Sequence, residues 1–179
     1  YLNLPPNKNY IINKKSKIKS FFKSSITSKD ILPKKNWYKK FEKYWDVSED
    51  NSKKILRDLI QNKIKNYGTT RDIPSIEGTS KLSPYIKFGQ MHVGTIWKKC
   101  NEIKSKGIGY RKYINELGWR EFSHSLINYF PEFLKGNFRK EFNKFPWVKN
   151  DKFLKAWKNG ITGYPIVDAG MRELYETGW

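Results

Sequence analysis

The sequence contains one cysteine and two histidines among its 179 residues. Cys100 alone cannot form a disulfide within the chain or supply a thiolate metal cluster, so a reducing, cytoplasmic location is the simple expectation. His92 is expected on a surface and His124 on a long helix, and neither predicts a metal site. No apolar run approaches the roughly 20 residues that span a bilayer, so no membrane segment is expected.

Acidic residues are scarce: 17 Asp and Glu stand against 36 Lys and Arg, for a formal net charge of +19. Such an excess attracts polyanions, because bound phosphates release their counterions. Lysine, asparagine and isoleucine are all abundant, however, as an AT-rich coding sequence would produce, and many lysines then only keep the surface solvated. Charge alone leaves both interpretations open.

Aromatic residues are plentiful, with seven Trp, eleven Tyr and eleven Phe, and they can provide the bulk of a core for one domain. Residues 1–36 differ from the rest, because they are rich in lysine and sustain no apolar period. We interpret residues 1–36 as a basic interdomain linker and residues 37–179 as the folded part.

From Trp37 onward the apolar spacing is helical, beginning with Trp37, Phe41, Tyr44 and Trp45. Ser83 and Pro84 are a typical helix cap and first turn, while Gly107 and Gly109 are expected to break a helix. No stretch predicts a strand, and residues 133–147 are expected to be rich in loops. The fold class is therefore all-α, with helices expected over residues 52–66, 83–89, 93–104, 110–129, 151–158 and 165–178.

Two segments carry candidate chemistry. Residues 79–83 read Thr-Ser-Lys-Leu-Ser at the start of a helix, where hydroxyls, a cation and free amides can bind an anion such as a pyrophosphate. Plain helix capping is the alternative there. On the helix over 110–129, Tyr113, Glu116, Arg120 and Ser123 share one face. Glu116 with Arg120 could instead be a surface ion pair, and the adjacent Trp119 a core residue.

The order and spacing of these segments carry a resemblance. The first segment is Tyr67 with Arg71-Asp72-Ile73-Pro74, and the second is Glu77-Gly-Thr-Ser-Lys-Leu-Ser-Pro84. After them come Asn115-Glu-Leu-Gly-Trp-Arg-Glu-Phe122 and Thr162-Gly-Tyr-Pro-Ile-Val-Asp-Ala169. Together they resemble the FAD-binding helical domain of the DNA photolyase/cryptochrome family, and most of all class I cyclobutane pyrimidine dimer photolyases. The resemblance implies a multi-helical domain that is incomplete at its C-terminus, with residues 37–179 as its N-terminal part.

The resemblance also implies roles for single residues. Lys81 stands where the family usually has arginine, so a point charge replaces a bidentate fork. Trp147 is expected at the surface end of a tryptophan chain that passes electrons to the flavin, while Trp157 is expected to be a packing residue. FAD contacts are expected from Tyr67, Thr79, Ser80, Lys81, Leu82, Ser83 and Tyr113. DNA contacts are expected from Arg71, Glu116, Trp119 and Arg120. Glu116, Trp119 and Trp147 are also the expected catalytic residues: Glu116 would hydrogen-bond the damaged bases and Trp119 would stack on the flipped dimer.

The implied activity is the light-driven splitting of cyclobutane dimers by an electron from reduced FAD, with UV-damaged DNA as partner and a monomeric protein. A cryptochrome photoreceptor and a basic nucleic-acid-binding module without chemistry remain alternatives, and the (6-4) lesion remains open as substrate. An antenna chromophore, folate or deazaflavin, would bind outside this chain. The chain alone is expected to be inactive.

Ala169-Gly170 is expected to permit close helix packing.

Overall fold

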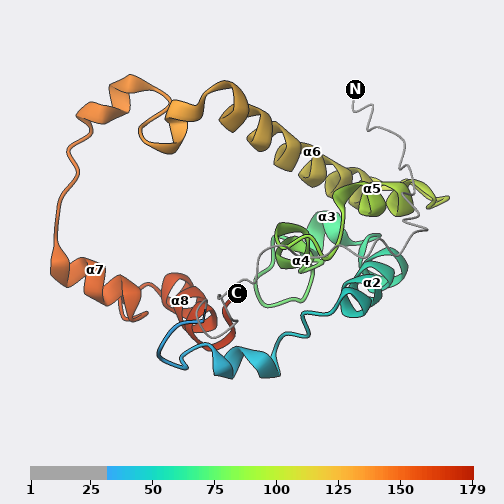
Figure 1. Ribbon diagram of the computed structural model, residues 1–179, viewed down its shortest axis with the longest axis horizontal. Coiled ribbons are helices and arrows are strands. Elements are labelled where there is room, and N and C mark those ends of the chain that lie inside the picture. Colours follow the sequence, from blue (N-terminus) through green and yellow to red (C-terminus); the bar gives the residue numbers. More distant parts are fainter. Residues whose placement is uncertain (1–31) are drawn as a thin grey trace, which may run out of the picture. The chain divides into compact units, whose positions relative to one another are not determined.

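The computed structural model describes residues 32–179, which form helices joined by loops (Figure 1). No strand occurs within that range, so the expected all-α class is confirmed for the described residues. Most of the linker expected over residues 1–36 lies outside the described residues. The described chain divides into two compact units, residues 47–149 and residues 32–46 with 150–179, and each is considered by itself.

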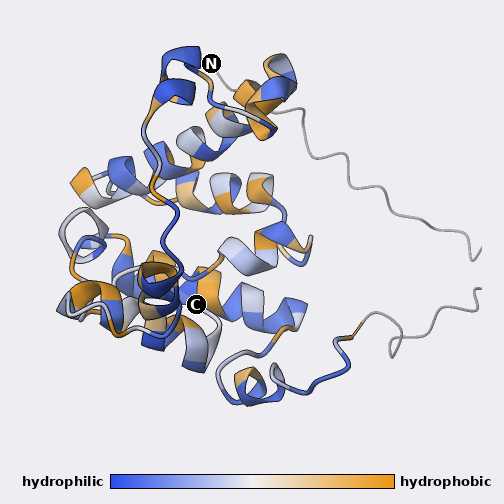
Figure 2. Ribbon diagram, turned by 90° about the vertical axis from the view of Figure 1, so that its left-hand side faces the viewer, coloured by the Kyte–Doolittle hydropathy of each residue, from blue (hydrophilic) through white to orange (hydrophobic). Residues whose placement is uncertain are grey.

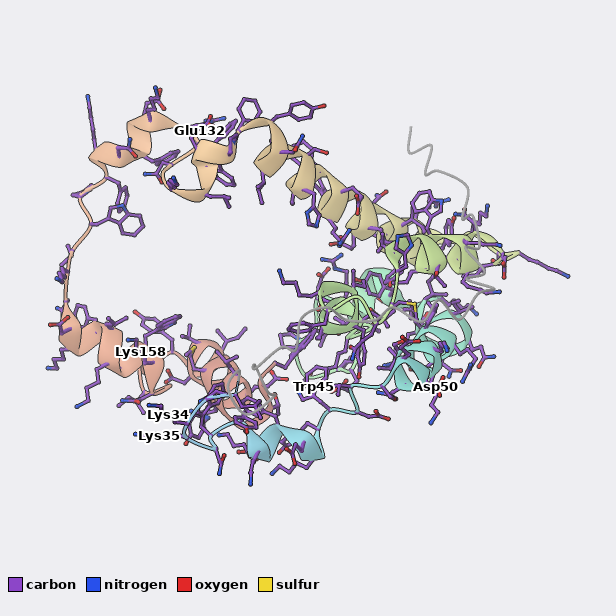
Figure 3. The ribbon with its side chains drawn as sticks, viewed as in Figure 1. Lys34, Lys35, Trp45, Asp50, Glu132 and Lys158 are labelled. Atoms are coloured by element: carbon purple, nitrogen blue, oxygen red, sulfur yellow. The ribbon has the colours of Figure 1, made fainter. Side chains whose placement is uncertain are left out.

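The larger unit begins with α2 (Glu49–Asp58), whose N-cap is Ser48. The Ser48 hydroxyl accepts a hydrogen bond from the amide of Asn51 at 3.1 Å, and acidic residues in the first turn, such as Asp50 in Figure 3, suit the helix dipole. A π-helical turn, η2 (Leu59–Lys63), follows directly and is closed by the bond from Ile64 N to Leu59 O at 2.8 Å. The turn leaves both Leu59 and Ile64 buried.

Four further α-helices complete the packed part of this unit. They are α3 (Tyr67–Thr70), α4 (Ser83–Lys87), α5 (Val93–Asn101) and α6 (Ile108–Tyr129). Helices α3 and α5 both pack against α6, and Figure 2 shows hydrophobic and hydrophilic residues interleaved along the helices, as partly buried helices require. The most deeply buried large side chains of the unit are Leu59, Leu82, Tyr85, Ile96 and Cys100.

The predicted break between α5 and α6 is confirmed at Gly107, the N-cap of α6, but Gly109 already lies inside α6, so the prediction was wrong for Gly109. It is buried, and a Cβ atom at this position would stand 2.1 Å from the carbonyl oxygen of Ile64. The glycine is therefore needed for the close approach of α6 to the end of the π-helical turn.

The second half of α6 leaves the packed part of the unit (Figure 1). The buried residues of this helix end at Leu117, and none of residues 119–149 is buried. After α6 the chain forms two short 3-10 helices, η3 (Pro131–Leu134) and η4 (Lys140–Lys144), so the expected loop-rich stretch is confirmed. Large exposed side chains in this region include Trp119, Phe122, Tyr129, Leu134, Trp147 and Val148.

The smaller unit contains η1 (Lys39–Lys43), α7 (Asp151–Lys158) and α8 (Pro165–Thr177). The helix expected around residues 37–45 is therefore a single 3-10 element. Both later helices end as predicted, at glycines with left-handed backbone, Gly160 at φ +63° and Gly178 at φ +79°. Lys158 closes α7, where a cation suits the dipole (Figure 3).

The Thr162–Ala169 motif has a structural role in this unit. The Asp168 carboxylate accepts hydrogen bonds from the amide and hydroxyl of Thr162, at 2.7 and 2.6 Å, and from the amide of Gly163 at 2.9 Å. These bonds to Asp168 hold the loop at Thr162 and Gly163 against the first turns of α8. The expected close packing at Ala169-Gly170 was wrong: both residues are exposed, and a Cβ atom at Gly170 would meet nothing within 4 Å.

Candidate functional site

Segments distant in sequence meet at Tyr113, on the buried side of α6. Its ring meets the ring of Tyr67 edge to face, with centroids 5.1 Å apart. The Ser80 side chain lies near the Tyr113 hydroxyl. Burial raises the pKa of the Tyr113 phenol, and the neighbouring Ser80 hydroxyl opposes that rise. Tyr113 therefore joins the segment at Tyr67, the loop at Ser80 and the long helix.

An ion pair forms one turn further along α6. Glu116 Oε1 contacts Nη1 of Arg71, the C-cap residue of α3. The hydrogen bond to Glu116 raises the pKa of the Arg71 guanidinium, which keeps its full charge. The sequence left open a pair between Glu116 and Arg120, but Arg120 pairs with its neighbour Glu121. Glu116 is thus directed toward α3.

The loop before α4 is fixed by backbone contacts. A Cβ atom at Gly78 would stand 2.4 Å from the carbonyl oxygen of Thr70, so the loop lies directly against the end of α3. Lys81 adopts a left-handed backbone with φ +52°, and the Ser80 hydroxyl accepts a bond from the amide of Leu82 at 3.3 Å. The prediction that Ser83 caps α4 was wrong, because Leu82 holds the cap position and Ser83 is already helical.

The donor chemistry of this loop fits the phosphates of FAD. The side chains of Thr79 and Ser83 form no hydrogen bond within residues 32–179. With the ammonium of Lys81, which contacts Glu77 at 2.8 Å, they provide hydroxyl and cationic donors of the kind that phosphate oxygens accept. Helix α4 has five residues, so local donors rather than a long helix dipole would supply the binding. Leu82 is buried and anchors the loop.

Trp119 is 62% exposed, which excludes the alternative that it is a core residue. Its ring contacts Phe122 edge-on, with centroids 5.7 Å apart and planes at 80°. The hydroxyl of Ser123 donates to the carbonyl oxygen of Trp119 at 2.9 Å, so Ser123 serves the helix backbone. An indole held at its edge and open on its surface can stack on a planar partner.

Trp147 lies in the exposed stretch after α6, 79% accessible, with its ring 4.8 Å from that of Phe145. Its role in electron transfer stays a prediction.

Cys100 is buried, which raises the pKa of its thiol to about 11 and keeps it unreactive. No group of three His, Cys, Asp or Glu side chains among residues 32–179 could hold a metal ion. In the same range, every helix is too short or too polar to cross a membrane.

Two features of the site were missed from the sequence. Gly78 was noted as part of a motif, but its contact with Thr70 depends on tertiary structure. The approach of Arg71 to Glu116 was also missed, since the two residues are 45 positions apart in the chain. The one available signal was that Arg71 and Glu116 both belong to segments that the sequence analysis had singled out.

Comparisons with known proteins agree with the motifs. A family model described as the FAD binding domain of DNA photolyase matches residues 113–179. A deoxyribodipyrimidine photo-lyase of Agrobacterium fabrum is 37% identical over 153 residues, which cover 83% of this chain and 32% of the relative. The enzyme of the same name from Escherichia coli is 37% identical over 141 residues, covering 76% of this chain and 30% of the relative.

A solved structure gives the same result. The crystal structure of a bacterial class III photolyase from Agrobacterium tumefaciens matches with a TM-score of 0.74 and 36% identity, covering 83% of this chain and 31% of that one. The chain therefore spans about a third of the length of these relatives. The likeness to class I enzymes expected from the sequence stays a prediction beside this class III neighbour.

Proposed function

Since this chain belongs to the DNA photolyase family, we propose that the protein carrying it repairs UV-damaged DNA by splitting cyclobutane pyrimidine dimers with light. One observation supports the proposal above the others: the Tyr113 ring contacts Tyr67 and its hydroxyl lies near Ser80, while Glu116 is one turn away on the same helix. The segments assigned to the cofactor and to the lesion are thus adjacent within one compact unit.

The cofactor implied by the matching domain is FAD. Bound and reduced, it would supply the electron that blue light transfers to the lesion. Lys81 and the hydroxyls of Thr79, Ser80 and Ser83 would hold its phosphates. Tyr67, Tyr113 and Leu82 would exclude water beside it, because all three are buried. These assignments rest on the residues' chemistry and on their neighbours in the loop and on α6.

The lesion would be held by side chains that follow Tyr113 on α6. Trp119 would stack on a pyrimidine turned out of the duplex, as enzymes that act on bases require. Glu116 would accept hydrogen bonds from the base edges. Arg71 and Arg120 would serve backbone phosphates, and the net charge of +19 would draw DNA to the protein.

We also propose that the chain by itself lacks repair activity. It spans about a third of its relatives, and none of residues 119–149 is buried within its own unit. A site completed by further residues would bind FAD weakly in their absence. We propose that the full-length protein acts as a monomer and binds any antenna chromophore outside this chain.

The test is a repair assay on the full-length protein. Purified protein should show flavin absorption, and under blue light with a reductant it should remove cyclobutane dimers from an irradiated oligonucleotide, as read by chromatography of the digested DNA. A flavoprotein that leaves the dimers intact would support a cryptochrome-type photoreceptor. Removal of (6-4) lesions instead would contradict the substrate assignment. Protein without flavin would leave the basic nucleic-acid-binding module.

A further inference from the structure

Within residues 32–179, the Arg71 side chain interacts with Glu116, Asp72 and Tyr67. Its Nη1 contacts Glu116, and its Nε lies 3.2 Å from Oδ1 of Asp72. The guanidinium carbon lies 5.6 Å from the centre of the Tyr67 ring. The Arg71 side chain is 27% exposed, so it lies at the surface of the site rather than in the core.

The Arg71 guanidinium would have two partners, because it pairs with Glu116 and is also the proposed contact for a DNA phosphate. Arginine has five N–H donors in a fixed planar fork, and a phosphate would be bound by the same edges that now face carboxylates. Glu116 in turn has one oxygen occupied by Arg71. A base that hydrogen-bonds Glu116 and a phosphate that binds Arg71 would therefore each change the partner available to the other.

We propose that Arg71 is a positioning residue which holds Glu116 in the DNA-free protein, and that a backbone phosphate competes with Glu116 for its guanidinium. The inference rests on the proposed function, to which it adds a coupling between backbone contact and lesion contact. DNA that engages Arg71 loosens Glu116 and allows its carboxylate to turn to the lesion. A phosphate of undamaged DNA must displace Glu116 from Arg71, and no contact between Glu116 and a lesion then offsets the loss of the ion pair.

A double-mutant cycle on the full-length protein measures this coupling. The variants are Glu116→Gln, Arg71→Gln and both together, with affinity for an undamaged duplex measured by fluorescence anisotropy at several salt concentrations. Because a partly exposed ion pair is weak, we expect Glu116→Gln to tighten undamaged-DNA binding about two- to fivefold. That gain should vanish when Arg71 is already glutamine, since no guanidinium remains to be released.

Glu121→Gln is the matched control. Glu121 lies on the same helix and is similarly exposed, at 33% against 38% for Glu116, but it pairs with Arg120. The Glu121→Gln variant removes the same charge as Glu116→Gln, so its effect on affinity for undamaged DNA should be equal with Arg71 present or absent. Arg71→Lys keeps a cation without the fork, and should restore part of the coupling even if the glutamine variant folds poorly.

The outcomes separate this inference from the proposed function. If the Glu116→Gln gain is the same in both Arg71 backgrounds, Arg71 is a simple phosphate contact and the inference is wrong, although dimer repair by the wild type still stands. If the wild type neither prefers dimer-containing DNA nor repairs it, the proposed function fails and the inference fails with it.

Discussion

The rings of Tyr67 and Tyr113 meet edge to face, with centroids 5.1 Å apart and planes at 86°. Both side chains are buried, and each comes from a segment that the sequence assigned to the cofactor. The pair is thus at once part of the core and part of the candidate site. Its two roles can be separated by removing the hydroxyl and the ring in turn.

Tyr113→Phe should preserve the ring contact and remove only the buried hydroxyl beside Ser80, which should cost at most about 0.5–1.5 kcal/mol of unfolding free energy. Tyr113→Ala removes the ring as well and should cost about 3–5 kcal/mol, as for other buried aromatic residues. Urea denaturation followed by circular dichroism measures both. Equal losses for the two variants would show that the ring contact contributes nothing to stability.

Two glycines on α6 provide a matched pair for a second prediction. Gly109→Ala should destabilise, because its Cβ atom would stand 2.1 Å from the Ile64 carbonyl oxygen. Gly118→Ala places the same atom where nothing lies within 4 Å, and should stabilise the helix by about 0.5–1 kcal/mol. Thermal unfolding of the two variants should move in opposite directions. A gain for both would contradict the close approach at Gly109.

Helix positions could largely be predicted from the sequence, because glycine and proline mark their ends. Gly160 and Gly178 adopt the left-handed backbone that ends α7 and α8, and Pro131 follows the end of α6. Such signals are local. The 3-10 turn at residues 39–43 was missed because aromatic spacing alone does not specify the hydrogen-bond pattern.

The candidate site was predictable as a set of segments, while its contacts were not. Order and spacing singled out Tyr67, Ser80 and Glu116 from the resemblance alone. Which side chains touch depends on how α3 crosses α6, and that crossing depends on a glycine at 109 whose role the sequence misread. Local pattern identifies residue types, whereas tertiary packing decides that Arg71 rather than Arg120 is the partner of Glu116.

A third prediction concerns acid stability. Hydrogen bonds from Thr162 and Gly163 lower the pKa of Asp168 below its ordinary value. A carboxyl whose folded pKa is lowered stabilises the fold above its unfolded pKa, about 4, and this contribution is lost as pH falls through the lower folded pKa. Asp168→Asn should therefore weaken the fold at neutral pH and flatten the loss of stability below about pH 4.

Asp151→Asn is the control for that experiment, because Asp151 is an exposed residue in the first turn of α7. Glu176 also has a lowered pKa, through its bonds with Lys43 and Tyr44, so part of the acid dependence should survive in the Asp168 variant. Denaturation midpoints measured across the acid range decide the question. An unchanged pH profile in Asp168→Asn would show that its hydrogen bonds are not stabilising.

The last prediction tests Trp119 as the stacking surface for the lesion. Its side chain is 62% exposed, so Trp119→Ala should change the stability of the full-length protein little. Loss of one stacking contact should weaken binding of dimer-containing DNA by about 1–3 kcal/mol, roughly 5- to 150-fold, and affect undamaged DNA less. Tyr129→Ala is the control, since Tyr129 lies on the same helix, is 76% exposed and has no assigned role. A loss of affinity that is equal for damaged and undamaged duplexes would assign Trp119 to general DNA contact. A loss in both variants would trace the effect to the exposed aromatic surface of the helix rather than to a lesion-specific site.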